Sequence, residues 1–88
     1  MKLIIAILKH EDTEIVSNAL VAAHFRVTQI ASTGGFLRHG STTLMIGLDE
    51  DKVDEAIEIV RQTCAPAHDP ALKRATLFVL DVPRFEQL

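Results

Sequence analysis

The sequence predicts an α+β fold in which two helices cover one face of a four-stranded antiparallel sheet. Two observations predict it. Four segments are apolar and rich in β-formers, and the segments that follow the first and third of them carry apolar residues every three to four positions. A chain of 88 residues is long enough for one hydrophobic core and too short for a second. We therefore expect residues 1–88 to form a single domain.

The first strand and helix are predicted from the N-terminal quarter of the chain. Leu3–Leu8 is apolar throughout, which indicates a central strand covered on both faces. The helix after it is expected to begin at Asp12 or Thr13, either of which can cap an N-terminus, and to end at His24. Its predicted core-facing stripe is made of Ile15, Val16, Ala19, Leu20 and Ala23.

A second strand and a glycine-rich hairpin follow. The strand is predicted from Arg26 to Ser32, with Arg26 and Thr28 on one face because strand side chains alternate. The two glycines of Thr33-Gly34-Gly35 allow backbone conformations that leave N–H groups free to bind an anion. The next pair, Phe36-Leu37, either folds under its own hairpin or contacts a ligand, and a purine base could stack on the Phe36 ring.

The second half of the chain repeats the pattern. A third strand is predicted over Thr42–Leu48, in which Gly47 marks a place of close approach to the backbone. Acidic residues then open a helix, as the helix dipole favours, and Pro66 ends it. The predicted stripe of this helix is Val53, Ala56, Ile57 and Val60. The remaining elements are a loop over Ala65–Lys73, a strand over Ala75–Val82 and a tail over Pro83–Leu88.

This order of elements is that of the ferredoxin-like βαββαβ fold, whose two helices pack on the same sheet face. The other face stays uncovered, although the first, third and fourth strands are apolar on both sides. A large exposed apolar sheet face is rare in a soluble monomer. We therefore predict a homo-oligomer whose subunits bury these faces against one another, with ligand sites at the interfaces.

Composition narrows the classes of function. A net charge of −3 argues against binding to nucleic-acid polymers, yet it permits a small phosphate ligand. The N-terminus lacks a signal-peptide pattern and its longest apolar run is too short to cross a bilayer, so we expect a cytoplasmic protein without membrane contact. The single Cys64 has no internal disulfide partner and is expected to act as a small apolar residue near a helix end.

Neither a metal site nor a catalytic site is expected. The four histidines lack the short spacing that places two ligands on one face of a helix or strand. Ser32, Thr33 and Ser41 lie near His39 in the sequence, but nothing holds a nucleophile beside a base and an orienting partner.

Several segments together carry a family pattern: MKLIIAI at the N-terminus, FRVT and ASTGGFLR around the hairpin, Ile46-Gly47, Val53-Asp54-Glu55 and the terminal RFEQ. In these segments the sequence resembles, nearly from end to end, the PII-like family of bacterial cyclic di-adenosine monophosphate (cyclic di-AMP) receptors. The block Ala31–Arg38 together with the tail is the most specific part of the match.

The resemblance implies a homotrimeric signal-transduction protein, without catalytic activity or cofactor, that holds cyclic di-AMP at each of three subunit interfaces. It implies ligand-binding roles for Arg26, Val27, Thr28, Gly35, Phe36, Leu37, Ser41, Gly47, Phe78 and Gln87. The chain departs from the family at His24 and Ser41, where asparagine is common, and its Ala65–Lys73 loop is markedly shorter. That loop is expected to move when the ligand binds. Its shortening is therefore expected to affect transmission of the signal more than formation of the binding pocket.

Several alternatives stay open at this point. The forked guanidinium of Arg26 suits a phosphate, but a strand arginine can also pair with a surface acid. Arg38 either adds charge at the site or keeps the loop soluble, and the Gln87 amide either reads an adenine edge or docks the tail. Two other functions are possible: a PII-like sensor of ATP or another adenine nucleotide, and a trimer that regulates a partner without any nucleotide.

Overall fold

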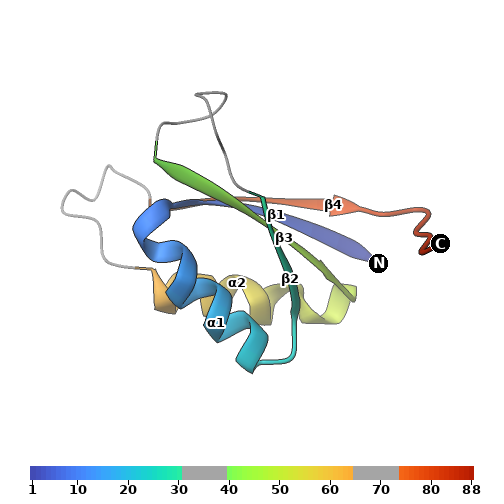
Figure 1. Cartoon of the computed structure of the whole chain (residues 1–88). Coiled ribbons are helices and arrows are strands. Elements are labelled where there is room, and N and C mark those ends of the chain that lie inside the picture. Colours follow the sequence, from blue (N-terminus) through green and yellow to red (C-terminus); the bar gives the residue numbers. More distant parts are fainter. Residues whose placement is uncertain (31–39, 65–73) are drawn as a thin grey trace.

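A computed structural model of the chain describes residues 1–30, 40–64 and 74–88. The elements are β1 (Lys2–Lys9), η1 (His10–Asp12), α1 (Thr13–Ala22), β2 (Arg26–Ile30), β3 (Ser41–Leu48), η2 (Glu50–Lys52), α2 (Val53–Thr63) and β4 (Ala75–Asp81), where η1 and η2 are single 3-10 turns. The strands pair antiparallel in the order β2-β3-β1-β4. Both helices lie on one side of this sheet (Figure 1). The predicted ferredoxin-like arrangement is confirmed.

The core lies between the helices and the sheet. Alternate residues of β1 point into it, and Ile4 and Ala6 are fully buried opposite Ile46 and Leu44 of β3. The helices contribute Val16, Leu20, Ala56 and Val60, each no more than 2% exposed. Val53 and Ile57 pack against this core, so the stripe predicted for the second helix is confirmed.

The beginning of α1 differs from the prediction. Neither Asp12 nor Thr13 caps the helix with its side chain: the Asp12 carboxylate bonds instead to Arg74, and the Thr13 hydroxyl donates to the Lys9 carbonyl (3.3 Å). The reason is η1, whose His10 carbonyl accepts the Thr13 N–H and so replaces a side-chain cap.

The stripe predicted for α1 is correct at Val16 and Leu20 and wrong at Ile15, which is 60% exposed. Ile15 lies about 100° around the helix from Val16. That rotation carries it past the edge of the surface that the sheet and α2 cover. An exposed isoleucine at the margin of a stripe is common in soluble proteins.

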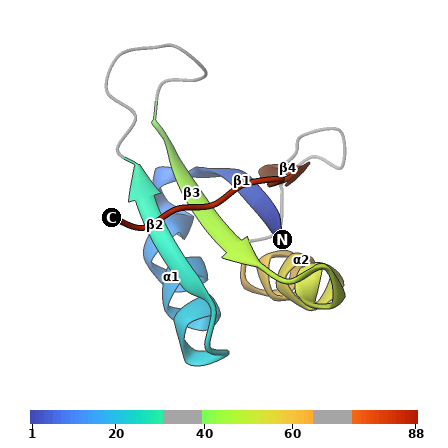
Figure 2. The same cartoon turned by 90° about the vertical axis from the view of Figure 1, so that its right-hand side faces the viewer.

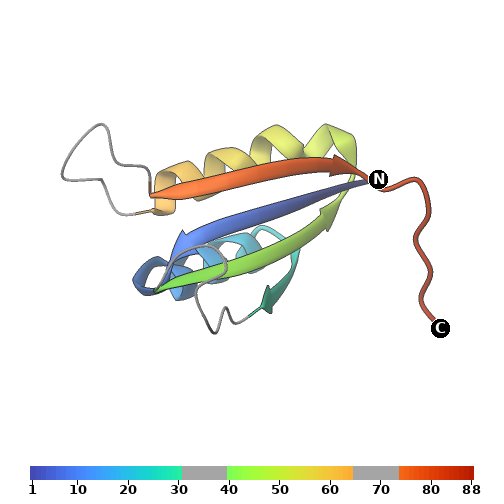
Figure 3. The same ribbon diagram turned by 90° about the horizontal axis from the view of Figure 1, so that it is seen from above.

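The sheet face turned away from the helices, here called the open face, has no helix on it (Figure 3). On β1 it presents Leu3, Ile5 and Ile7, which are half-buried. Their β4 neighbours Leu80 and Phe78 are 44% and 50% exposed. The expectation that β1 is covered on both faces therefore holds within one chain only on the helix side.

The C-terminal tail runs across the end of the sheet. From β4 it passes the start of β1 and the end of β3 toward the side on which β2 begins (Figure 2). The Val82 N–H donates to the Met1 carbonyl (3.0 Å), which ties the base of the tail to the N-terminus. No helix among the described residues is long and apolar enough to span a membrane.

Candidate ligand-binding site

A hollow of about 980 Å³ lies where the open face, the end of α1 and the C-terminal tail meet. Its volume is that of a pocket for a nucleotide-sized ligand. Four of the predicted binding residues line it: Arg26 and Thr28 on β2, Gly47 on β3 and Gln87 in the tail. The rest of its wall comes mainly from Met1, Leu3, His24, Phe25, Met45, Asp49, Lys52, Glu55, Val82 and Phe85.

The strand register explains why these residues meet. Arg26 lies opposite Gly47, and Thr28 lies opposite Met45. Because side chains alternate along a strand, all four positions belong to the open face. Gly47 in turn lies opposite Leu3 of β1, so this row of the sheet has no side chain between Arg26 and Leu3. The gap forms the floor of the hollow.

Close approach to Gly47 comes from the chain itself. A Cβ atom added at this position would lie 2.9 Å from the Cε atom of Met1. The prediction that Gly47 marks a close contact with its backbone is therefore confirmed, and the contacting group is the N-terminal methionine. Glycine leaves room both for Met1 and for the hollow above it.

Arg26 is the cation of β2 that faces the hollow. Within the part of the chain that the structure describes, no carboxylate lies within ion-pairing distance of its guanidinium, so the alternative of a surface ion pair finds no partner there. Lys52, the other basic side chain in the wall, lies 3.7 Å from Glu55. Among the described residues, no ion pair occupies the Arg26 guanidinium, whose five N–H donors suit an anionic ligand.

His24 also lines this hollow, although the sequence analysis did not place it among the binding residues. It follows the end of α1 with a backbone φ of 72°, in the left-handed region. In the sequence, His24 stands out as a position where asparagine is common in the family, and the fold shows that it borders the same space as Arg26.

Three of the predicted binding residues do not line this hollow. Val27 is on the helix face and packs against the core. Ser41 is buried, 8% exposed, at the opposite end of β3 from Gly47. Phe78 is on the open face of β4, in the same row as Thr28 but three strands away, about 14 Å at ordinary strand spacing. Gly35, Phe36 and Leu37 lie outside the described residues, as do Arg38 and the Ala65–Lys73 loop.

Cys64 is half-buried where α2 ends, and it packs against the core. Burial raises the pKa of its thiol, the charge of Asp12 raises that pKa further, and Arg74 opposes both effects. A thiol with a raised pKa is a poor nucleophile at neutral pH. Among residues 1–30, 40–64 and 74–88, no group of three His, Cys, Asp or Glu side chains is placed to hold a metal ion.

The family model of the cyclic-di-AMP receptors matches residues 1–70. The chain belongs to the cyclic-di-AMP receptor family. This is a family of signalling receptors rather than of enzymes, and the resemblance to it is confirmed over residues 1–70, which include the hairpin motif.

A solved structure extends the match beyond residue 70. The crystal structure of a functionally unknown protein from Pediococcus pentosaceus ATCC 25745 is 35% identical to this receptor-family chain, with a TM-score of 0.80. The similarity covers 99% of this chain and 96% of that one, so the two chains have nearly the same length. The fold described above, β4 included, is therefore shared with a protein of similar size.

Proposed function

We propose that this member of the cyclic-di-AMP receptor family is a non-catalytic signalling protein that binds cyclic di-AMP at the subunit interfaces of a homotrimer. The observation that carries the proposal is the hollow in which Arg26, Thr28, Gly47 and Gln87 meet. These residues come from three parts of the chain, and the resemblance implied a ligand role for each of them. Membership of the receptor family supports the ligand class.

The chemistry of these side chains matches the parts of a cyclic dinucleotide. The forked guanidinium of Arg26 can donate two hydrogen bonds to one phosphodiester, and the Thr28 hydroxyl can donate a third. The Gln87 side chain has an NH₂ donor and a carbonyl acceptor. An adenine edge offers the complementary ring-nitrogen acceptor and amino donor, so the two can form a pair of hydrogen bonds. Gly47 leaves space for the ligand next to the strand backbone.

The trimer is supported by the open face. Phe78 and Leu80, which neighbour the half-buried side chains of β1, are 50% and 44% exposed in one chain, and Ile30 on the edge strand β2 is 44% exposed. Covering this apolar surface would release its ordered hydration, and a copy of the same chain supplies a matching apolar surface. A second subunit packed there would also enclose the hollow, which one chain leaves open to solvent.

Signalling would follow from differential binding. A ligand shifts a conformational equilibrium only if it binds one arrangement more tightly than the other. We propose that cyclic di-AMP favours one arrangement of the connections beside the site and that the short Ala65–Lys73 loop limits the size of the output. A lone, protonated cysteine suits the reducing cytoplasm, in which we place the protein.

The charges of the hollow argue against ATP as the ligand. Its charged side chains are Arg26 and Lys52 against Asp49 and Glu55, two positive and two negative. With Lys52 already beside Glu55, one arginine remains for a ligand phosphate. A single guanidinium matches a phosphodiester, which carries one negative charge, better than it matches a triphosphate.

The proposal is tested by isothermal titration calorimetry with cyclic di-AMP, cyclic di-GMP and ATP. We expect binding of cyclic di-AMP and at least tenfold weaker binding by Arg26→Ala, about 1.4 kcal/mol. Arg61→Ala is the matched control, because Arg61 lies on α2 and pairs with Glu58. No heat with any of the three nucleotides would contradict the proposal and favour a trimer that acts without nucleotide.

A further inference from the structure

The position of His24 in the hollow is held by the backbone on both sides of it. The His24 N–H donates to the Val21 carbonyl (2.9 Å) and the Phe25 N–H donates to the Leu20 carbonyl (3.0 Å). These two bonds make the Schellman motif, a common end of an α-helix. Phe25 packs against the core and anchors the turn. The imidazole is therefore attached to a fixed point of the wall rather than to a flexible loop.

His24 and Arg26 face the same space from the two sides of this turn. Both line the hollow and both are exposed, so neither side chain is occupied by the core. Within the described residues, His24 has no side-chain hydrogen bond or ion pair. An anion held by Arg26 therefore lies within the region that the imidazole can also reach.

The other charged side chains that line the hollow come from β2, from α2 and from the segment that leads into α2. Arg26 belongs to β2, Lys52 to η2 and Glu55 to α2, while Asp49 precedes η2. With His24 neutral, two positive side chains face two negative ones, and protonation of His24 raises the net side-chain charge of the wall from 0 to +1.

We propose that His24 makes anion binding in this hollow pH-dependent, its imidazolium acting with Arg26 as a second cationic contact for the phosphodiester. This rests on the function proposed above. Imidazole is the side chain that gains a positive charge between neutral and mildly acidic pH, whereas a phosphodiester keeps its single negative charge throughout that range. Binding therefore tightens as the pH falls, because the protein gains charge and the ligand does not.

The test compares the wild-type chain, His24→Asn and His10→Asn in calorimetric titrations with cyclic di-AMP at pH 5.5 and pH 7.5, at one ionic strength. His10 is the control histidine, because it lies beside Thr42 at the end of β3 opposite Gly47. Asparagine tolerates the left-handed backbone of position 24 and does not titrate. Circular dichroism at both pH values checks that each variant is folded.

We expect the wild-type dissociation constant to fall at least about fivefold from pH 7.5 to pH 5.5, as for the gain of one charge-assisted hydrogen bond. The change should be less than about twofold in His24→Asn and should persist in His10→Asn. Equal pH dependence in wild type and His24→Asn would overturn the inference and leave the proposed function standing. Absence of binding by the wild type at both pH values would overturn the proposed function, and this inference with it.

Discussion

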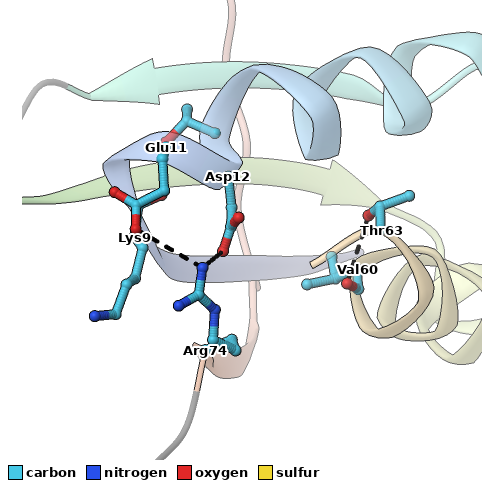
Figure 4. A network of polar contacts seen from close by, with 7 residues as sticks. Lys9, Glu11, Asp12, Val60, Thr63 and Arg74 are labelled. Atoms are coloured by element: carbon cyan, nitrogen blue, oxygen red, sulfur yellow. Dashed lines mark hydrogen bonds and ion pairs between the residues drawn. The ribbon is translucent and has the colours of Figure 1, made fainter. Parts of the chain in front are cut away.

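The Nη2 atom of Arg74 donates a 2.8 Å hydrogen bond to the Oδ2 atom of Asp12 and so joins the start of β4 to the turn that precedes α1 (Figure 4). On its other side the same turn, η1, contacts the beginning of β3 and the residue before it. The His10 N–H donates to the Gly40 carbonyl (2.8 Å), and the Nδ1 atom of His10 lies 3.1 Å from the Thr42 hydroxyl oxygen. The turn η1 therefore contacts Gly40, which follows residues 31–39, and Arg74, which follows residues 65–73.

We expect Asp12→Ala to lower the free energy of unfolding by about 2 kcal/mol. The Asp12 and Arg74 side chains are only 6% and 18% exposed, and removing one partner of a buried pair leaves the other charge without compensation. Glu11 lies 3.8 Å from the same guanidinium and offsets part of the loss. Urea denaturation at a fixed chain concentration measures the change.

Glu58→Ala is the control for this prediction. It removes the exposed ion pair with Arg61 on α2 and should cost less than about 1 kcal/mol. Equal losses in the two variants would show that the Asp12–Arg74 pair contributes no more than a surface contact.

We expect Phe78→Asp to dissociate the assembly without unfolding the chain. Phe78 is half-exposed at the centre of β4 on the open face, and a carboxylate there would have to be buried without a partner in any interface on that face. Light scattering should report a fall from three chain masses to one. Ile15→Asp places the same charge on an equally apolar, 60% exposed position of α1 and should leave the mass at three. A trimer that survives Phe78→Asp would place the interface elsewhere.

We expect Gly47→Ala to weaken binding of cyclic di-AMP while leaving stability nearly unchanged. The added methyl group meets only the far end of the Met1 side chain, which can move at little cost. In the liganded site the same methyl group occupies the floor of the hollow, and overfilling a packed site costs roughly 1–3 kcal/mol, a loss of about fivefold or more in affinity. Calorimetry and thermal unfolding separate the two effects. Unchanged affinity would show that the ligand does not bind against Gly47.

The ion pair between Lys2 and Asp81 predicts a stability change at both extremes of pH. The hydrogen bond between the two groups raises the pKa of Lys2 and lowers the pKa of Asp81. The stabilising effect of Asp81 is therefore complete above its ordinary pKa of 3.8 and is lost as the pH falls through the lowered value. That of Lys2 is complete below its ordinary pKa of 10.5 and is lost as the pH rises through the raised value.

Asp81→Asn tests this dependence. Wild type should be the more stable protein at pH 7, by a small margin that added salt reduces, because both groups are solvent-exposed. The difference between the two proteins should shrink as the pH is lowered below 3.8, the ordinary pKa of Asp81. A difference that stays constant as the pH is lowered would assign the effect of Asp81 to a contact other than its charge.

The sequence by itself determined the elements and their faces. The three-to-four spacing in α2 depends only on near neighbours in the chain, and it was read correctly at Ala56 and Val60. The apolar run Leu3–Leu8 predicted the strand β1 but not that one chain covers only its helix side. The same local reasoning failed at Asp12, which was expected to cap a helix. Its partner Arg74 lies 62 positions away, and no local pattern announces so distant a contact.

The candidate site also combines residues that the sequence identified with residues that only the fold brought together. Arg26, Thr28, Gly47 and Gln87 were identified from the resemblance, and strand alternation placed Arg26 and Thr28 on one face. The register of β2 against β3 adds Gly47 to that face. Only the tertiary structure decided that His24 joins them, that Met1 fills the space at Gly47, and that the tail brings Gln87 to the same hollow. These placements depend on strand order, on a helix end with a left-handed residue and on the path of the tail, and each of those is set by packing between segments that are remote in the sequence.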